Sequence, residues 1–82
     1  MTFQDVLKSV TAQRSGYAAA KLLGIYPQTF YKYANGQKIP SDEILDKIIE
    51  LTGLPTESVY LAAYAERLHN KVAADAFRHL AA

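Results

Sequence analysis

The chain has no cysteine among its 82 residues, and it has only four glycines and three prolines. Without cysteine it has no disulfide framework. No uninterrupted apolar run approaches the roughly 20 residues that span a bilayer, and no charged segment followed by an apolar one marks a secretory signal. These absences predict a cytoplasmic protein with no membrane partner.

Charge of one sign is missing from a long stretch of the chain. No acidic residue occurs between Asp5 and Asp42, although the chain has eight acidic residues and a formal net charge of +1. The same stretch carries the basic residues Lys8, Arg14, Lys21, Lys32 and Lys38. Because it would approach phosphate groups without repulsion, this segment indicates binding to nucleic acid.

The length and composition predict one small domain over residues 1–82. Half of the residues are hydrophobic, but a chain of this size buries only about 60% of its unfolded surface, so its stability alone is marginal. A subunit interface adds buried apolar area. We therefore expect the protein to associate with itself.

Apolar residues recur at helical spacing and strand-like alternation is absent, which predicts an all-α fold. Capping and breaking residues place helices at about 3–13, 16–23, 27–34 and 42–52, then 56–69 and 71–80. The last two share one apolar spacing and can also form a single helix. The expected architecture is a compact bundle of five or six helices.

Side-chain periodicity also predicts which faces of these helices are buried. In the second helix we expect an inner face of Ala19, Leu22 and Leu23. In the third helix Phe30, Tyr33 and Ala34 face inward. The acidic residues of the fourth helix belong to its outer face, and they are Asp42, Glu43, Asp46 and Glu50.

The segment LGIYPQTFYKYANGQKIPS, at positions 23–41, resembles the Cro/C1-type helix-turn-helix family of phage repressors and xenobiotic-response-like bacterial regulators. The shared pattern is a small residue in helix 2, a glycine and a hydrophobic residue at the turn, an apolar pair in helix 3 and a Gly-x-x-x-Pro-Ser loop. Here it is filled by Ala20, Gly24, Ile25, Phe30 with Tyr33, and residues 36–41.

The resemblance covers about the first two thirds of the chain and implies a lambda-repressor-like DNA-binding fold. Residues 1–54 would be the helix-turn-helix part, and residues 55–82 would be a C-terminal helical extension for dimerisation. The chain departs from the family at Tyr26 and Pro27, where relatives often have a hydroxyl or amide N-cap and a glutamine.

The same resemblance places DNA contacts on particular side chains. The positions that touch base edges in relatives fall on Gln28, Tyr31 and Lys32, which share a helix face. A glutamine amide can pair with adenine, a lysine with guanine, and a tyrosine ring can pack on a thymine methyl. The phosphate-facing positions fall on Ser15, Tyr17, Thr29, Asn35, Gln37 and Lys38.

The C-terminal third has more apolar side chains than a small helical head needs as cover. They predict a dimer interface that holds two recognition helices about 34 Å apart, as a two-fold operator requires. The predicted dimerisation residues are Tyr60, Leu61, Tyr64, Leu68, Val72, Phe77 and Leu80. The alternative is that these helices only complete the core of their own domain.

Nothing in the sequence favours catalysis. The histidines His69 and His79 have no cysteine or acidic cluster at ligand spacing, so we expect no metal site. The acidic residues of the fourth helix are explained by solvation and by the helix dipole. No cofactor is expected.

The sequence therefore predicts a transcriptional repressor of prophage type, which binds a palindromic operator in double-stranded DNA as a homodimer, with residues 27–34 in the major groove. A different possibility is an antitoxin-like interaction module whose C-terminal helices bind a partner protein, such as a toxin. A nucleoid-like binder without sequence preference is less favoured by the low net charge. Without a ligand-sensing domain, release from DNA would need a signal such as a protein antirepressor.

Overall fold

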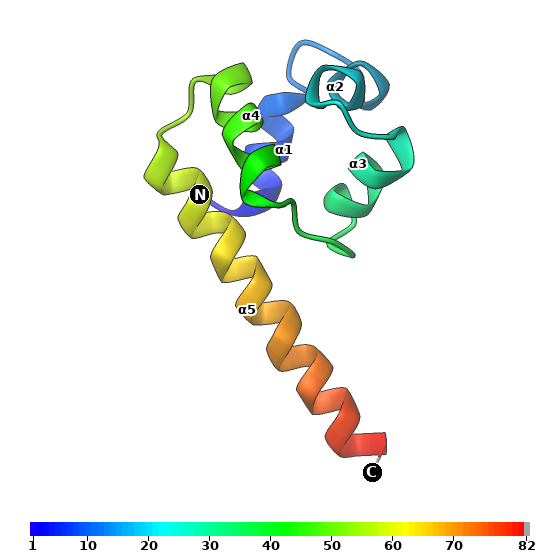
Figure 1. Cartoon of the computed structure of the whole chain (residues 1–82). Helices are drawn as coiled ribbons and strands as arrows, with labels where there is room; N and C mark the ends of the chain where they lie inside the picture. Colours follow the sequence, from blue (N-terminus) through cyan, green and yellow to red (C-terminus); the bar gives the residue numbers. More distant parts are fainter. Residues whose placement is uncertain (82) are drawn as a thin grey trace.

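The computed structural model describes the backbone of residues 1–81 and the side chains of residues 1–69, 71 and 72. Over these residues the chain contains helices and no strand, which confirms the all-α prediction. The helices are α1 (Phe3–Val10), α2 (Gly16–Leu23), α3 (Pro27–Ala34), α4 (Asp42–Thr52) and α5 (Thr56–Ala81), as Figure 1 shows.

The C-terminal third is one continuous helix of 26 residues, not two. Its first half packs on α1 and α4, whereas its second half extends away from the globular body (Figure 1). The radius of gyration is 13.5 Å, above the roughly 12 Å expected for a fully compact domain of this length. The projecting end of α5 accounts for the difference, since the molecule measures 45 × 26 × 19 Å.

Helix α1 begins where the sequence predicts and ends earlier. Thr2 and Asp5 form a capping box: the Asp5 amide donates to Thr2 Oγ1 at 3.2 Å, and the Thr2 amide donates to Asp5 Oδ2 at 3.0 Å. These bonds to Thr2 lower the pKa of the Asp5 carboxyl. The prediction that the helix continues to residue 13 was wrong: it ends at Val10, and Thr11 donates its hydroxyl back to the Leu7 carbonyl.

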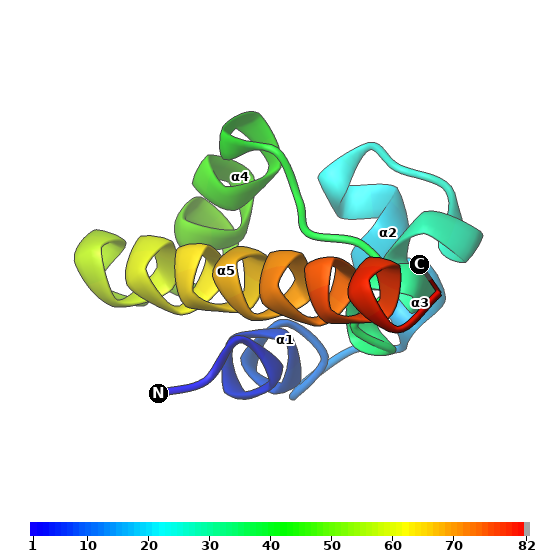
Figure 2. The same ribbon diagram turned by 90° about the horizontal axis from the view of Figure 1, so that it is seen from below.

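The core lies where α1, α2, α3, α4 and the first half of α5 meet. Seen from below, α5 runs along the molecule between α1 and α4 (Figure 2), and it packs against both. The buried side chains are Phe3, Val6, Leu7, Val10, Ala19, Ala20, Leu23, Phe30, Tyr33, Leu45, Ile48, Val59, Ala62 and Ala63. Within the described side chains, the core therefore stops at Ala63, well before the end of α5.

One predicted core residue is in fact on the surface. Leu22 is 60% exposed, and Ala20 is buried in its place. Periodicity alone does not distinguish the two, because both are apolar and both border the inner face of a short helix. The inward face predicted for α3 is confirmed, with Phe30 and Tyr33 buried and Ala34 partly buried.

No helix within residues 1–81 is both long and apolar enough to cross a membrane.

Candidate nucleic-acid interface

Helices α2 and α3 are joined by a tight turn at residues 24–26. Ser15 caps α2 by accepting from the Ala18 amide at 3.1 Å. Gly24 ends the helix with φ of 73°, a left-handed conformation that costs glycine no Cβ clash. The Ile25 amide then bonds back to the Ala20 carbonyl at 3.0 Å. Because Pro27 supplies the first residue of α3, the chain leaves one helix and enters the next within a few residues.

Helix α3 is held by its apolar face and presents its polar face to solvent. The rings of Phe30 and Tyr33 are buried, and burial raises the pKa of the Tyr33 hydroxyl, which stays neutral. Gln28 and Lys32 are exposed on the opposite side. At about 100° per residue, Gln28, Lys32 and Asn35 lie within about 60° of one another around the helix axis. They form one polar stripe along α3.

Tyr31 lies at the edge of this stripe and leans toward the neighbouring helices. Its side chain is 53% exposed, and its ring packs edge-on to Phe30 with centroids 6.3 Å apart. A Cβ placed on Gly16 would lie 3.4 Å from the Tyr31 ring, an ordinary contact distance, so the ring lies against the start of α2. The orientation of Tyr31 is therefore partly fixed by α2.

Most of the predicted phosphate-contacting residues are on the surface of α2, α3 and the loop after α3. Thr29 is only partly exposed, and the Ser15 oxygen already accepts a backbone hydrogen bond, which leaves its hydroxyl proton available as a donor. The others have exposed side chains, and they are Tyr17, Asn35, Gln37 and Lys38. None of these residues carries a carboxylate, so none of them repels an anion.

The α3–α4 loop, residues 35–41, is attached at both ends. Gly36 adopts φ of 75°, and the Gln37 amide bonds back to the Lys32 carbonyl at 2.9 Å. At the other end Pro40 is fully buried, and its carbonyl oxygen accepts from Arg67 Nη2 on α5 at 2.7 Å. Gln37 and Lys38 therefore project from a short, doubly anchored segment.

The basic residues between Asp5 and Asp42 differ in their contacts. Arg14 donates to the Val10 carbonyl at 2.7 Å, which satisfies the C-terminal end of α1. In the described part of the chain, neither Lys32 nor Lys38 pairs with a carboxylate. Of the predicted base- and phosphate-contacting side chains, these two therefore carry unneutralised positive charge.

Sequence reasoning did not count Tyr26 among the site residues, yet it is the most exposed of the large apolar side chains described, at 78%. It stands at the N-cap of α3 and makes no side-chain capping bond. The signal was present in the sequence, since tyrosine is unusual at an N-cap. Tyr17, Tyr26 and Tyr31 together place three exposed aromatic rings on α2, α3 and the turn between them.

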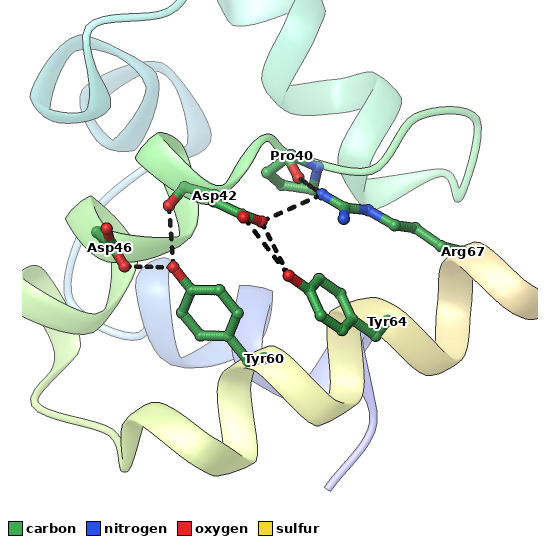
Figure 3. Close-up of polar contacts among 6 residues, drawn as sticks. All are labelled: Pro40, Asp42, Asp46, Tyr60, Tyr64 and Arg67. Carbon is green, nitrogen blue, oxygen red and sulfur yellow. Dashed lines mark hydrogen bonds and ion pairs between the residues drawn. The ribbon is translucent and has the colours of Figure 1, made fainter.

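The acidic start of α4 faces α5 and forms a polar cluster with it (Figure 3). The Tyr60 hydroxyl donates to Asp46 Oδ1, and the Tyr64 hydroxyl bonds to the Asp42 carboxylate at 3.3 Å. The hydrogen bond to Asp46, together with desolvation and the nearby negative charges, raises the pKa of Tyr60 to about 12. Of the four acids on the outer face of α4, Asp42 and Asp46 thus contact α5.

This cluster divides the predicted dimerisation residues into two groups. Tyr60 and Tyr64 bond to α4 of their own chain. The second group, which we call the α5 stripe, consists of Leu61, Leu68 and Val72, with exposed fractions of 70%, 66% and 68%, against 42% for Tyr64. The side chains of Phe77 and Leu80 lie outside the described residues.

Among the described residues, no group of histidine or acidic side chains has the arrangement of a metal site. His69 is exposed and borders a shallow hollow between α5 and the N-terminus, whereas the side chain of His79 lies outside the described part.

The chain matches none of the protein-family models, curated proteins or solved structures with which it was compared.

Proposed function

We propose that this protein is a sequence-specific DNA-binding repressor in which α2 and α3 act as a helix-turn-helix and α3 enters the major groove. The observation that carries the proposal is the polar stripe of α3, which is exposed and lies within residues 6–41, a segment that contains no acidic residue. An α-helix fits the major groove of B-DNA, where amide and ammonium groups can pair with base edges. In this arrangement Gln28, Tyr31 and Lys32 read bases.

The surrounding surface supplies the contacts that orient the helix on the duplex. Ser15 and Tyr17 lie at the start of α2, Asn35 ends the stripe, and Gln37 and Lys38 follow it in the α3–α4 loop. Phosphate contacts of this kind fix the register of a protein on DNA without reading its sequence. Repression then follows from occupancy of a promoter and needs no chemistry.

A homodimer completes the proposal, and the α5 stripe is the surface that supports it. Leu61, Leu68 and Val72 lie on one face of α5, since Leu68 follows Leu61 by about two helical turns and Val72 follows Leu61 by about three. A row of exposed apolar side chains at this spacing suits pairing with a second helix. Two copies joined along α5 would present two copies of α3 to successive major grooves.

Selection from a library of random duplexes, followed by a fluorescence polarisation titration, tests the DNA-binding proposal. We expect an enriched inverted repeat, bound with a Kd of roughly 10⁻⁸ M or tighter, and an affinity that falls steeply as salt rises. Binding without any enriched sequence would favour the nucleoid-like alternative. No binding, or binding that is insensitive to salt, would contradict the proposal.

The α5 stripe also fits the antitoxin-like alternative, because its exposed apolar side chains can equally contact a helix of another protein. Light scattering of the purified protein separates the two. A homodimer supports self-association, and the variant Leu68→Glu then tests whether α5 carries the interface. A stable monomer that forms a defined complex with the product of a neighbouring gene would favour the interaction module.

A further inference from the structure

Arg67 joins α5 to the segment that follows the proposed recognition helix. Its Nη2 atom donates to the Pro40 carbonyl at 2.7 Å and lies 3.7 Å from Asp42 Oδ1, across a sequence separation of 27 residues to Pro40 (Figure 3). The guanidinium therefore holds both the last part of the α3–α4 loop and the first residue of α4.

The neighbours of Arg67 fix the orientation of its side chain. The guanidinium carbon lies 4.9 Å from the centre of the Tyr64 ring, within the range of a cation–π contact. The Tyr64 hydroxyl in turn bonds to the same Asp42 carboxylate, at 3.3 and 3.4 Å. The Tyr64 ring and the Asp42 carboxylate thus orient the Arg67 side chain at the end of the α3–α4 loop.

The loop is also close to α5 at its other end. A Cβ placed on Gly36 would lie 3.7 Å from Glu66 Oε1, so α5 passes beside the start of the loop as well as its end. Gln37 and Lys38 lie between these two points and have exposed side chains. The conformation of the segment that carries them is therefore set by α5 and not by α3 alone.

From this geometry we propose that Arg67 is a positioning residue for DNA binding, which orders the α3–α4 loop so that Lys38 and Gln37 meet phosphates. The inference rests on the proposed function. Arg67 itself touches no DNA in this account and acts through the Pro40 carbonyl. Both contacts are made by the same Nη2 atom. What a lysine would not reproduce is the planar guanidinium against the Tyr64 ring, which sets the direction of that nitrogen.

The test compares Arg67→Gln with Lys71→Gln, which removes an equal charge from an exposed position on the same helix. DNA affinity is measured on the duplex that the wild-type protein selects. We expect Arg67→Gln to weaken binding by roughly tenfold, and Lys71→Gln to change it by less than about twofold. Equal effects of the two substitutions would overturn the inference.

Three further readouts separate positioning from charge and from stability. Arg67→Lys should recover little of the lost affinity, and full recovery would show that only charge matters. Combined with Lys38→Gln, the Arg67→Gln substitution should cost less than it does alone, because both act on one contact. Amide hydrogen exchange at Gln37 and Leu45, whose amides bond to the Lys32 and Ser41 carbonyls at the two ends of the loop, should accelerate in Arg67→Gln without DNA, while the exchange of core amides in α1 stays unchanged.

The outcomes distinguish this inference from the function on which it rests. Wild-type protein that selects no duplex contradicts the proposed function, and with it the role of Arg67 in DNA affinity. If Arg67→Gln binds DNA with the same affinity as the wild type, the inference alone is contradicted. The same holds if the substitution leaves amide exchange in the loop unchanged.

Discussion

The hydroxyl of Tyr60 donates a hydrogen bond to the carboxylate of Asp46, with Oη and Oδ1 2.5 Å apart, and so joins α5 to α4. The same hydroxyl also lies 3.3 Å from the Asp42 carbonyl oxygen. Removing the phenolic proton would place a negative charge against Asp46. The interaction therefore stabilises the neutral form of Tyr60.

This bond predicts a dependence of stability on alkaline pH. The pKa of Tyr60 is about 12 in the folded protein, against about 10 for an unfolded chain. A raised pKa means that the contribution is complete below about pH 10 and is lost as the pH rises toward 12. Tyr60→Phe should therefore lower the free energy of unfolding at neutral pH and show a smaller further loss between these two pH values than the wild type.

Urea denaturation at pH 8 and above pH 10 measures this difference. Tyr17→Phe is the matched control, since Tyr17 is 65% exposed and lies on α2, away from the acids of α4. A near-ultraviolet titration against pH follows the ionisation of the tyrosines. Compared with the wild type, Tyr60→Phe should lack the tyrosinate signal that appears at the highest pH. An alkaline loss of stability that is the same in Tyr60→Phe and in the wild type would contradict the assignment.

Helix α3 should be stabilised by a better N-cap. Tyr26 makes no side-chain capping bond, whereas serine at an N-cap accepts from a backbone amide of the first turn and contributes about 1 kcal/mol. Tyr26→Ser should therefore raise the free energy of unfolding by about that amount, as measured by chemical denaturation. Tyr17→Ser, an equal loss of exposed ring inside α2, should bring no gain. A Tyr26→Ser protein that is less stable than the wild type would mean that the exposed ring has packing contacts of its own.

Gln28 and Lys38 should affect DNA binding in different ways. Gln28→Ala should cost about 1–3 kcal/mol on the selected duplex and relax the preference at one base pair, because it removes a base contact. Lys38→Gln should weaken binding to all duplexes alike and reduce the salt dependence of log K by about one. Polarisation titrations over a range of salt concentrations measure both. Identical behaviour of the two variants would show that the division into base and phosphate contacts is wrong.

The α5 stripe should control association without affecting the fold. Leu68 is 66% exposed, so Leu68→Glu should leave thermal stability of the monomer nearly unchanged while charge repulsion separates the two copies. Loss of the paired site should reduce operator affinity by roughly a hundredfold. Thr56→Glu, which adds the same charge at the exposed N-terminal end of α5, is the control and should remain dimeric. Light scattering that finds Leu68→Glu still dimeric would place the interface elsewhere.

The helices themselves could largely be predicted from local signals. Thr2 with Asp5, Ser15, Gly24 and Pro27 mark helix ends by chemistry that acts within a few residues, and the structure uses each of them as expected. Where the local signal was ambiguous, prediction failed. Residues 11–13 have acceptable helix propensity, but the chain there forms a turn with a bond from the Ala12 amide to the Ser9 carbonyl.

The contacts between distant segments could not be predicted. Whether Tyr60 and Tyr64 face a partner or their own α4 depends on the angle at which α5 crosses the body, and no local pattern encodes that angle. The bond from Arg67 to the Pro40 carbonyl is of the same kind. Exposure of Gln28 and Lys32 was predicted from periodicity, since burial of Phe30 and Tyr33 settles which side of α3 faces outward.

The end of the described core at Ala63 has an evolutionary consequence. In the proposed homodimer, substitutions at Leu68 and Val72 would leave the packing of the globular body untouched, so mutation could alter the recognition between copies while the fold and the α3 surface stay the same. Two duplicated genes in one cell need only diverge at such positions for their products to stop exchanging subunits. A few changes on a single helix would therefore be enough to prevent mixed dimers between the products of related genes.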